Sequence, residues 1–261
     1  MLDRRKFLGS GAVSVGAVAV NNQVQAEDAV ADSPSPDGYD YPLPAFNPGS
    51  RLVFQGDSIT DMKWGRNERD RNHYLGHSYV YLIASRLGVD MPEARLEFFN
   101  RGISGHKVAD LKSRWQKDAI DMRPDLLSIL VGVNDVGRAG AKGVPLDRWE
   151  ADYRSMLEDS RKANDKLRIV LLDPFVLRCG RLDNDSAWKR WRGEADKLRE
   201  IVARLARDFR AVHVRTQDVL DQAAEAVSPE HWIWDGVHPL PQGHELIARA
   251  WLQAVSTRWG K

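Results

Sequence analysis

A serine that could act as a nucleophile stands at position 58, within the stretch Gly-Asp-Ser-Ile-Thr of residues 56–60. This stretch directly follows an apolar run at 52–54 that is typical of a buried strand. Glycine permits a close turn after such a strand, and a helix that begins there would direct its free N–H groups toward negative charge. From this stretch alone a nucleophilic role for Ser58 is a hypothesis, because Gly, Asp, Ser and Thr are also common in ordinary turns.

A candidate base for this serine lies near the C-terminus, where Asp235 and His238 are separated by Gly-Val. In a tight turn, this spacing lets the carboxylate reach the imidazole Nδ1–H, fix the tautomer and stabilise the imidazolium. His106 is the rival among the seven histidines, but the only carboxylate near it in the sequence is Asp110. We therefore expect His238 to be the base and Asp235 to orient it.

Hydrogen-bond donors for an acyl-transfer reaction are also present in the sequence. Polar residues follow two further strand-like runs, at 100–105 and 132–135. Ligands of parallel α/β sheets lie at the carboxyl ends of the strands, so these segments and Ser58 can converge. We expect the backbone N–H groups of Ser58 and Gly105 and the side-chain amide of Asn134 to form an oxyanion hole.

The elements that would position these residues alternate between strand and helix from residue 51 onward. Apolar runs predict five strands, at 52–54, 96–99, 126–133, 167–172 and 211–214. Helical periodicity predicts helices at 77–87, 108–120, 146–163, 188–209, 217–226 and 242–255. This alternation is typical of an α/β fold, with a five-stranded parallel sheet covered by helices on both faces.

The N-terminal residues 1–26 have the pattern of an export signal. Arg4 and Arg5 precede an apolar, small-residue stretch, and a small-x-small cleavage site ends at Ala26. The paired arginines resemble the twin-arginine type, which predicts a periplasmic or extracellular protein of a bacterium. A retained anchor is the alternative to cleavage. The proline-rich residues 27–50 are interpreted as a linker or arm whose second half lies against the domain at 51–261.

The composition excludes several classes of function. A formal net charge of +1 gives no bias toward nucleic acid or an anionic membrane. The single cysteine, Cys179, excludes an internal disulfide and a multi-cysteine zinc site, and no His-Glu-x-x-His motif occurs. The first strand is followed by one glycine only, which argues against dinucleotide binding. We expect no cofactor, no metal and no stable membrane insertion after cleavage of the signal.

Four sequence blocks, in this order, resemble those of the SGNH superfamily, also called GDSL esterases and lipases. Residues 56–60 match the first block, Gly105 the second, residues 132–135 the third and residues 235–239 the fifth. The resemblance covers 51–258, with Ile59 where leucine often stands and the bulky His106 beside Gly105. It implies a flavodoxin-like three-layer α/β/α sandwich and metal-free ester hydrolysis. It also implies that Ser58 is the nucleophile and that Asp235 and His238 form its base.

Aromatic residues near these blocks suggest the substrate class. Trp64, Trp232 and Trp234, together with His106, are candidate substrate-binding residues, because aromatic faces can stack on sugars. No long apolar lid is visible. We expect a carbohydrate O-acetylesterase, similar to the acetylxylan esterases of this superfamily, that acts on an acylated small molecule or polysaccharide. A lysophospholipase or thioesterase, or a non-catalytic carbohydrate-binding protein of the same fold, are the alternatives. The sequence does not determine the oligomeric state.

Overall fold

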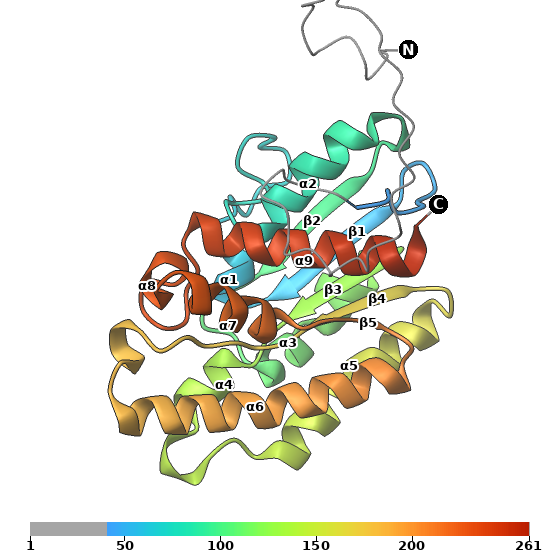
Figure 1. Ribbon diagram of the computed structural model, residues 1–261. Coiled ribbons are helices and arrows are strands. Elements are labelled where there is room, and N and C mark those ends of the chain that lie inside the picture. The colour runs from blue at the N-terminus through green and yellow to red at the C-terminus, as the bar shows by residue number, and fades with distance from the viewer. Residues whose placement is uncertain (1–40, 261) are drawn as a thin grey trace, which may run out of the picture. The chain divides into compact units, whose positions relative to one another are not determined.

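The computed structural model describes residues 41–260, and its centre is a five-stranded parallel sheet in the order β2-β1-β3-β4-β5 (Figure 1). The strands are β1 (Arg51–Gly56), β2 (Glu97–Gly102), β3 (Leu126–Leu130), β4 (Arg168–Leu172) and β5 (Val212–Val214). All five predicted strands are present: β1, β3 and β4 are buried on both faces of the sheet, whereas the edge strands β2 and β5 alternate buried and more exposed residues. The predicted export signal lies outside the described residues.

Helices cover both faces of this sheet, which confirms the predicted three-layer α/β/α architecture (Figure 1). The main helices are α2 (Tyr79–Asp90), α3 (Val108–Ser113), α5 (Leu146–Ala163), α6 (Asp185–Asp208), α7 (Thr216–Ala226) and α9 (Pro241–Trp259). Short helices are α1 (Ser58–Asp61), α4 (Val133–Arg138) and α8 (Pro229–Trp232). Helix α9 contacts both α2 and α7, whereas α5 contacts both α3 and α6.

Two predicted elements end several residues earlier in the structure than expected. The third strand ends at Leu130, because Gly132 has a φ of 135°, a conformation that favours glycine, and the chain then begins α4. The helix predicted at 108–120 is interrupted: α3 ends at Ser113, and one turn of π-helix follows at Gln116–Ile120. The break places Trp115 against α5, where its indole N–H donates to the Met156 carbonyl at 2.9 Å.

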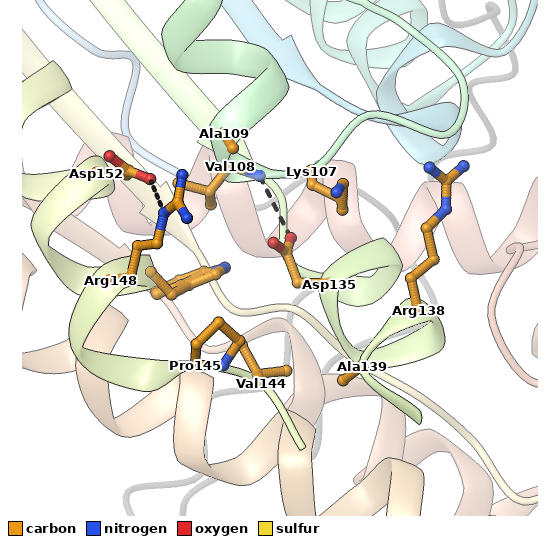
Figure 2. A pocket seen from close by; sticks show the side chains of 11 residues that line it. Lys107, Val108, Ala109, Asp135, Arg138, Ala139, Val144, Pro145, Arg148 and Asp152 are labelled. Carbon is orange, nitrogen blue, oxygen red and sulfur yellow. Dashed lines mark hydrogen bonds and ion pairs between the residues drawn. The ribbon is translucent and has the colours of Figure 1, made fainter. Parts of the chain in front are cut away.

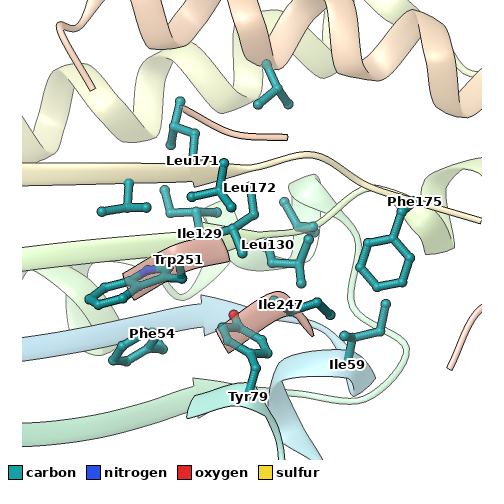
Figure 3. Close-up of a cluster of buried hydrophobic side chains, with 14 of the residues drawn as sticks. Phe54, Ile59, Tyr79, Ile129, Leu130, Leu171, Leu172, Phe175, Ile247 and Trp251 are labelled. Carbon is teal, nitrogen blue, oxygen red and sulfur yellow. The ribbon is translucent and has the colours of Figure 1, made fainter. Parts of the chain in front are cut away.

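Aromatic side chains join the sheet to the helices on one face (Figure 3). Phe54 of β1 packs between Tyr79 of α2 and Trp251 of α9, with ring centroids 6.2 and 5.6 Å away. The Trp251 indole N–H donates to the hydroxyl of Ser128 at 3.1 Å, so this buried polar group of β3 is satisfied. The packing fixes the central strands, whose carboxyl ends carry the polar segments described below.

Residues 41–50 lie against the end of α9 that is remote from those strand ends. The Ala45 N–H donates to the Trp259 carbonyl at 2.6 Å, and Pro44 and Gly260 form an antiparallel bridge. The Arg168 guanidinium lies 5.3 Å from the centroid of Phe46 and 5.2 Å from that of Trp259. Among the helices of the described residues, none has the length and apolar character needed to span a membrane.

Candidate active site

Ser58 is the first residue of α1, directly after the sharp turn that ends β1. A Cβ added at Gly56 would lie 2.2 Å from the Thr60 hydroxyl oxygen and 2.5 Å from the Leu130 carbonyl oxygen, so only glycine allows the helix to fold back this closely. The Asp57 carboxylate accepts a hydrogen bond from the Ile59 N–H at 3.0 Å and thereby caps the helix. The turn and its cap hold Ser58 at the carboxyl edge of the sheet.

Ser58, His238 and Asp235 form a continuous hydrogen-bonded chain. The Ser58 Oγ is 2.8 Å from His238 Nε2, and His238 Nδ1 is 2.8 Å from Asp235 Oδ2. The segments that carry these residues are far apart in the sequence and meet where β1 ends. The arrangement can transfer the serine proton to the imidazole while the carboxylate stabilises the resulting imidazolium.

The Asp235 carboxylate is held ionised by the turn in which it lies. Its Oδ1 accepts the backbone N–H groups of Val237 at 2.9 Å and of His238 at 2.7 Å. Partial burial by itself would raise the pKa of Asp235, but the hydrogen bonds from the His238 ring and from these two N–H groups outweigh it and lower the pKa to about 2. Asp235 therefore remains a carboxylate throughout the pH range in which an esterase would work.

The three predicted oxyanion donors come from three different strand ends. Within the described residues, neither the Ser58 N–H nor the Gly105 N–H is used in an intramolecular hydrogen bond, so both are free to donate. The Asn134 amide donates one of its two hydrogens to the His106 carbonyl at 3.1 Å, which fixes its orientation and leaves the second hydrogen available. These groups can stabilise a developing oxyanion.

Asp61, which the sequence analysis did not single out, connects the serine helix to the Gly105 loop. Its Oδ2 accepts the Ser104 N–H at 2.9 Å, the Ser104 hydroxyl at 2.7 Å and the Arg66 guanidinium at 2.6 Å. Burial alone would raise the pKa of Asp61, but these hydrogen bonds and the charge of Arg66 lower it below the ordinary value. The sequence signal that could have identified Asp61 is its position in α1, directly after Ser58-Ile-Thr.

Two more carboxylates lie beside the site, Asp57 buried and Asp135 partly buried, and removal from solvent raises the pKa of both. The pKa of Asp57 rises to about 7 and that of Asp135 to about 6. In Asp135 the backbone N–H of Val108, 3.3 Å from Oδ2, and the nearby Trp149 indole oppose the effect of burial. Among the described residues, no group of three or more His, Cys, Asp and Glu side chains is arranged to hold a metal ion.

His106 contacts Arg114 instead of Ser58. Its Nδ1 accepts a hydrogen bond from the Arg114 Nε at 3.3 Å. Burial, followed by the charge of Arg114, lowers the pKa of His106 and favours its neutral form. The backbone of His106 orients Asn134, whereas its ring contacts Arg114. A base would need to contact Ser58.

The three tryptophans that we expected at the site have different surroundings. Trp64 is only 8% exposed and its indole N–H donates to the Gly102 carbonyl at 2.9 Å, so little of its ring faces solvent. The Trp232 indole N–H donates to the Ala223 carbonyl at the end of α7 at 3.1 Å. Trp234 is 63% exposed, and its ring stacks at 6.5 Å on that of His238, so it is the tryptophan available to a substrate.

A cavity of about 270 Å³ lies beside the Asn134 segment, between α4, the start of α3 and the start of α5 (Figure 2). Asp135 points from α4 toward the Val108 backbone at its floor, and Arg148 pairs with Asp152 at its edge. Arg138 also lines the cavity, and its guanidinium would lie 3.2 Å from a Cβ at Gly105. The cavity and Arg138 thus border the candidate oxyanion loop.

Comparison with known proteins identifies the family of this chain. Residues 54–246 match the GDSL-like lipase/acylhydrolase family. The acetylxylan esterase of Geobacillus stearothermophilus is 34% identical over 218 residues, which are 81% of this chain and 96% of that protein.

Solved structures show the same likeness in three dimensions. A crystal structure of the Geobacillus esterase has a TM-score of 0.70 at 32% identity and covers 82% of this chain and 98% of its own. A structure from Parabacteroides merdae, assigned as a GDSL-like lipase, has a TM-score of 0.76 at 33% identity and covers 82% and 99%. The chain therefore belongs to the GDSL-like lipase/acylhydrolase family, and it is a carboxylic ester hydrolase close to acetylxylan esterase.

Proposed function

We propose that this protein removes short acyl groups, above all acetyl, from ester-substituted carbohydrates, with Ser58 as the nucleophile. The observation that carries the proposal is the 2.8 Å separation of Ser58 Oγ from His238 Nε2, combined with the 2.8 Å separation of His238 Nδ1 from Asp235 Oδ2. A base that is itself oriented by a carboxylate is what a serine needs to become a nucleophile.

The reaction proceeds in two steps. His238 takes the Ser58 proton while Ser58 Oγ attacks the ester carbonyl, and the N–H groups of Ser58, Gly105 and Asn134 stabilise the oxyanion. The intermediate collapses, and the sugar hydroxyl leaves with the proton from His238. A water molecule, deprotonated by His238, then hydrolyses the acyl-enzyme and regenerates Ser58.

The assignment of these roles is supported by the Geobacillus acetylxylan esterase. Its catalytic mutants replace a serine, an aspartate or a histidine by alanine. The aspartate and the histidine there are three positions apart, as Asp235 and His238 are. The activity of that protein on acetylated xylan supports a carbohydrate acetyl ester as the substrate here.

The alternatives differ in what they require of the site. A lysophospholipase or thioesterase would accept long acyl chains, which need an apolar channel beside Ser58. A non-catalytic carbohydrate-binding protein would have no use for a serine that is hydrogen-bonded to a paired histidine.

The test is acetate release from acetylated xylo-oligosaccharides by the wild type and by Ser58→Ala, His238→Ala and His106→Ala. By comparison with other serine hydrolases, we expect the first two substitutions to lower kcat by several powers of ten. His106→Ala should retain most of the activity, since its ring contacts Arg114.

Rates on 4-nitrophenyl acetate and octanoate decide the acyl length. Faster octanoate hydrolysis would favour the lipase alternative. Failure of a fluorophosphonate to label Ser58 in folded protein would favour the binding protein.

A further inference from the structure

The turn that carries Asp235 rests on the loop that follows β4. The Leu177 N–H donates to the Gly236 carbonyl at 3.1 Å, and the Cys179 thiol lies 3.0 Å from the Ile233 carbonyl oxygen. These contacts bring the two segments together on both sides of Asp235. The loop from 175 to 182 thus forms a support for the catalytic turn.

Gly180 brings the support within van der Waals contact of Asp235. A Cβ added at Gly180 would lie 2.7 Å from the Asp235 Cα and 2.9 Å from the Trp234 carbonyl oxygen. These distances are too short for any side chain to fit. This close approach places the next residue, Arg181, beside the Asp235 carboxylate.

Arg181 contacts the carboxylate oxygen that His238 uses. Its guanidinium is 3.3 Å from Asp235 Oδ2, and His238 Nδ1 is 2.8 Å from the same atom. The Arg181 guanidinium also lies 5.3 Å from the ring centroid of Trp191. Trp191, in turn, packs on Gly137 of the helix that carries Asn134, where a Cβ would lie 2.7 Å from its ring. Arg181 is thus held between the Asp235 turn and the Trp191 ring.

The charges around His238 determine what Arg181 does to it. The other titratable groups that face Asp235 or His238 are Asp57 from the cap of α1, Cys179 from the supporting loop and His244 from α9. When His238 is neutral, Asp235 and Arg181 balance each other. When His238 takes a proton, two cations share one carboxylate oxygen, and their repulsion disfavours the imidazolium.

We propose that Arg181 is a positioning residue that keeps Asp235 oriented and keeps His238 neutral, and so available as a base, at lower pH than the Asp-His pair alone would allow. The inference rests on the proposed catalytic roles of Ser58 and His238. It predicts an enzyme that stays active to lower pH and in which His238 is a weaker base.

The test compares pH profiles of kcat/KM for 4-nitrophenyl acetate in the wild type, Arg181→Gln and Arg181→Lys. Loss of the Arg181 charge favours the imidazolium form of His238. The acid limb of the pH profile of Arg181→Gln should therefore lie at higher pH than that of the wild type. For a half-exposed pair we expect the acid limb to move up by about half a pH unit. Arg181→Lys, which keeps the charge, should restore most of the wild-type profile.

Arg178→Gln is the matched control, because Arg178 is in the same loop and is equally exposed but pairs with Asp185 at 2.6 Å. Its profile should coincide with that of the wild type. Raising the ionic strength of the wild type should move its acid limb toward that of Arg181→Gln, since salt screens the repulsion. This salt titration remains decisive if the glutamine variant folds poorly.

Coincident acid limbs in the wild type and Arg181→Gln, or a salt-independent limb in the wild type, would overturn the proposal. An Arg181→Gln variant whose kcat falls equally at every pH, and which lysine does not rescue, would do the same, because that pattern indicates a structural defect only. A different result would overturn the proposed function itself: retention of activity by Ser58→Ala.

Discussion

Asp57 shows how one residue can serve the site and yet destabilise the fold. It caps the helix of Ser58 through Oδ1, while its other oxygen is buried without a partner among the described atoms. The pKa of Asp57 is raised to about 7, mainly by burial, from an ordinary value of 3.8. Between these two pH values the folded chain binds more protons at this site than the unfolded chain does. The Asp57 contribution to the free energy of unfolding therefore decreases as the pH rises from about 4 to about 7.

Asp57→Asn should abolish this decrease while it keeps the cap, because asparagine is an equally good capping residue. We expect the difference in unfolding free energy between variant and wild type to grow in favour of the variant from pH 4 to pH 8, by at most about 1.4 kcal/mol per pH unit. Urea denaturation at several pH values measures it. The exposed Asp147→Asn serves as the control, and parallel curves for wild type and Asp57→Asn would contradict the account.

At the scale of elements, the site depends on how the serine helix is tied to the Gly105 loop. The only side chain of α1 that reaches Ser104 in the hydrogen bonds of the described residues is Asp61, which accepts both its N–H and its hydroxyl. Asn100 supports the same junction from β2, where its amide donates to the Thr60 carbonyl at 2.7 Å. The position of the Gly105 N–H relative to Ser58 is therefore set by polar contacts between elements.

Asp61→Asn should loosen this junction, because an amide replaces an acceptor of three hydrogen bonds. We expect kcat to fall about 10- to 100-fold, somewhat less than the loss of an entire oxyanion donor, with little change in KM. Steady-state kinetics on 4-nitrophenyl acetate measures both constants. Asp70→Asn, which removes the same charge from the neighbouring loop, is the control. An unchanged kcat in Asp61→Asn would show that the junction does not position the donors.

At the scale of the whole molecule, the site and the arm at 41–50 lie at opposite ends of the sheet. Arg168 begins β4, and its guanidinium contacts the rings of Phe46 and Trp259 and donates to the Ala45 carbonyl at 2.5 Å. Burial lowers the pKa of Arg168, which remains charged like other arginines. Arg168 thereby attaches the arm to the C-terminal helix.

Arg168→Met should lower stability without affecting catalysis. The substitution keeps much of the apolar stem but removes the cation–π contacts and the hydrogen bond, so we expect a loss of about 1–3 kcal/mol in the free energy of unfolding. Thermal and urea denaturation give this value, and kcat/KM at a temperature where the variant is folded should equal that of the wild type. Arg210→Met on the exposed surface provides a baseline. A fall in kcat/KM would mean that the arm influences the site.

The sequence by itself determined the sheet and the residues of the candidate site. Short apolar runs specify strands without reference to their neighbours, and parallel strands bring their carboxyl ends to one edge. Ser58, Gly105 and Asn134 could therefore be placed near one another from their positions after the strands. The pairing of Asp235 with His238 was also predictable, because it is formed within a single turn.

The tertiary structure alone decided which side chains support those residues. Arg181 reaches Asp235, Asp61 reaches Ser104 and Trp64 is turned into the interior, and none of these contacts between distant segments is encoded by periodicity. Likewise, the end of β3 and the break after α3 depend on the backbone of Gly132 and on the packing of Trp115. Contacts between distant segments follow from how helices and loops pack on the sheet, and that packing is a property of the whole chain.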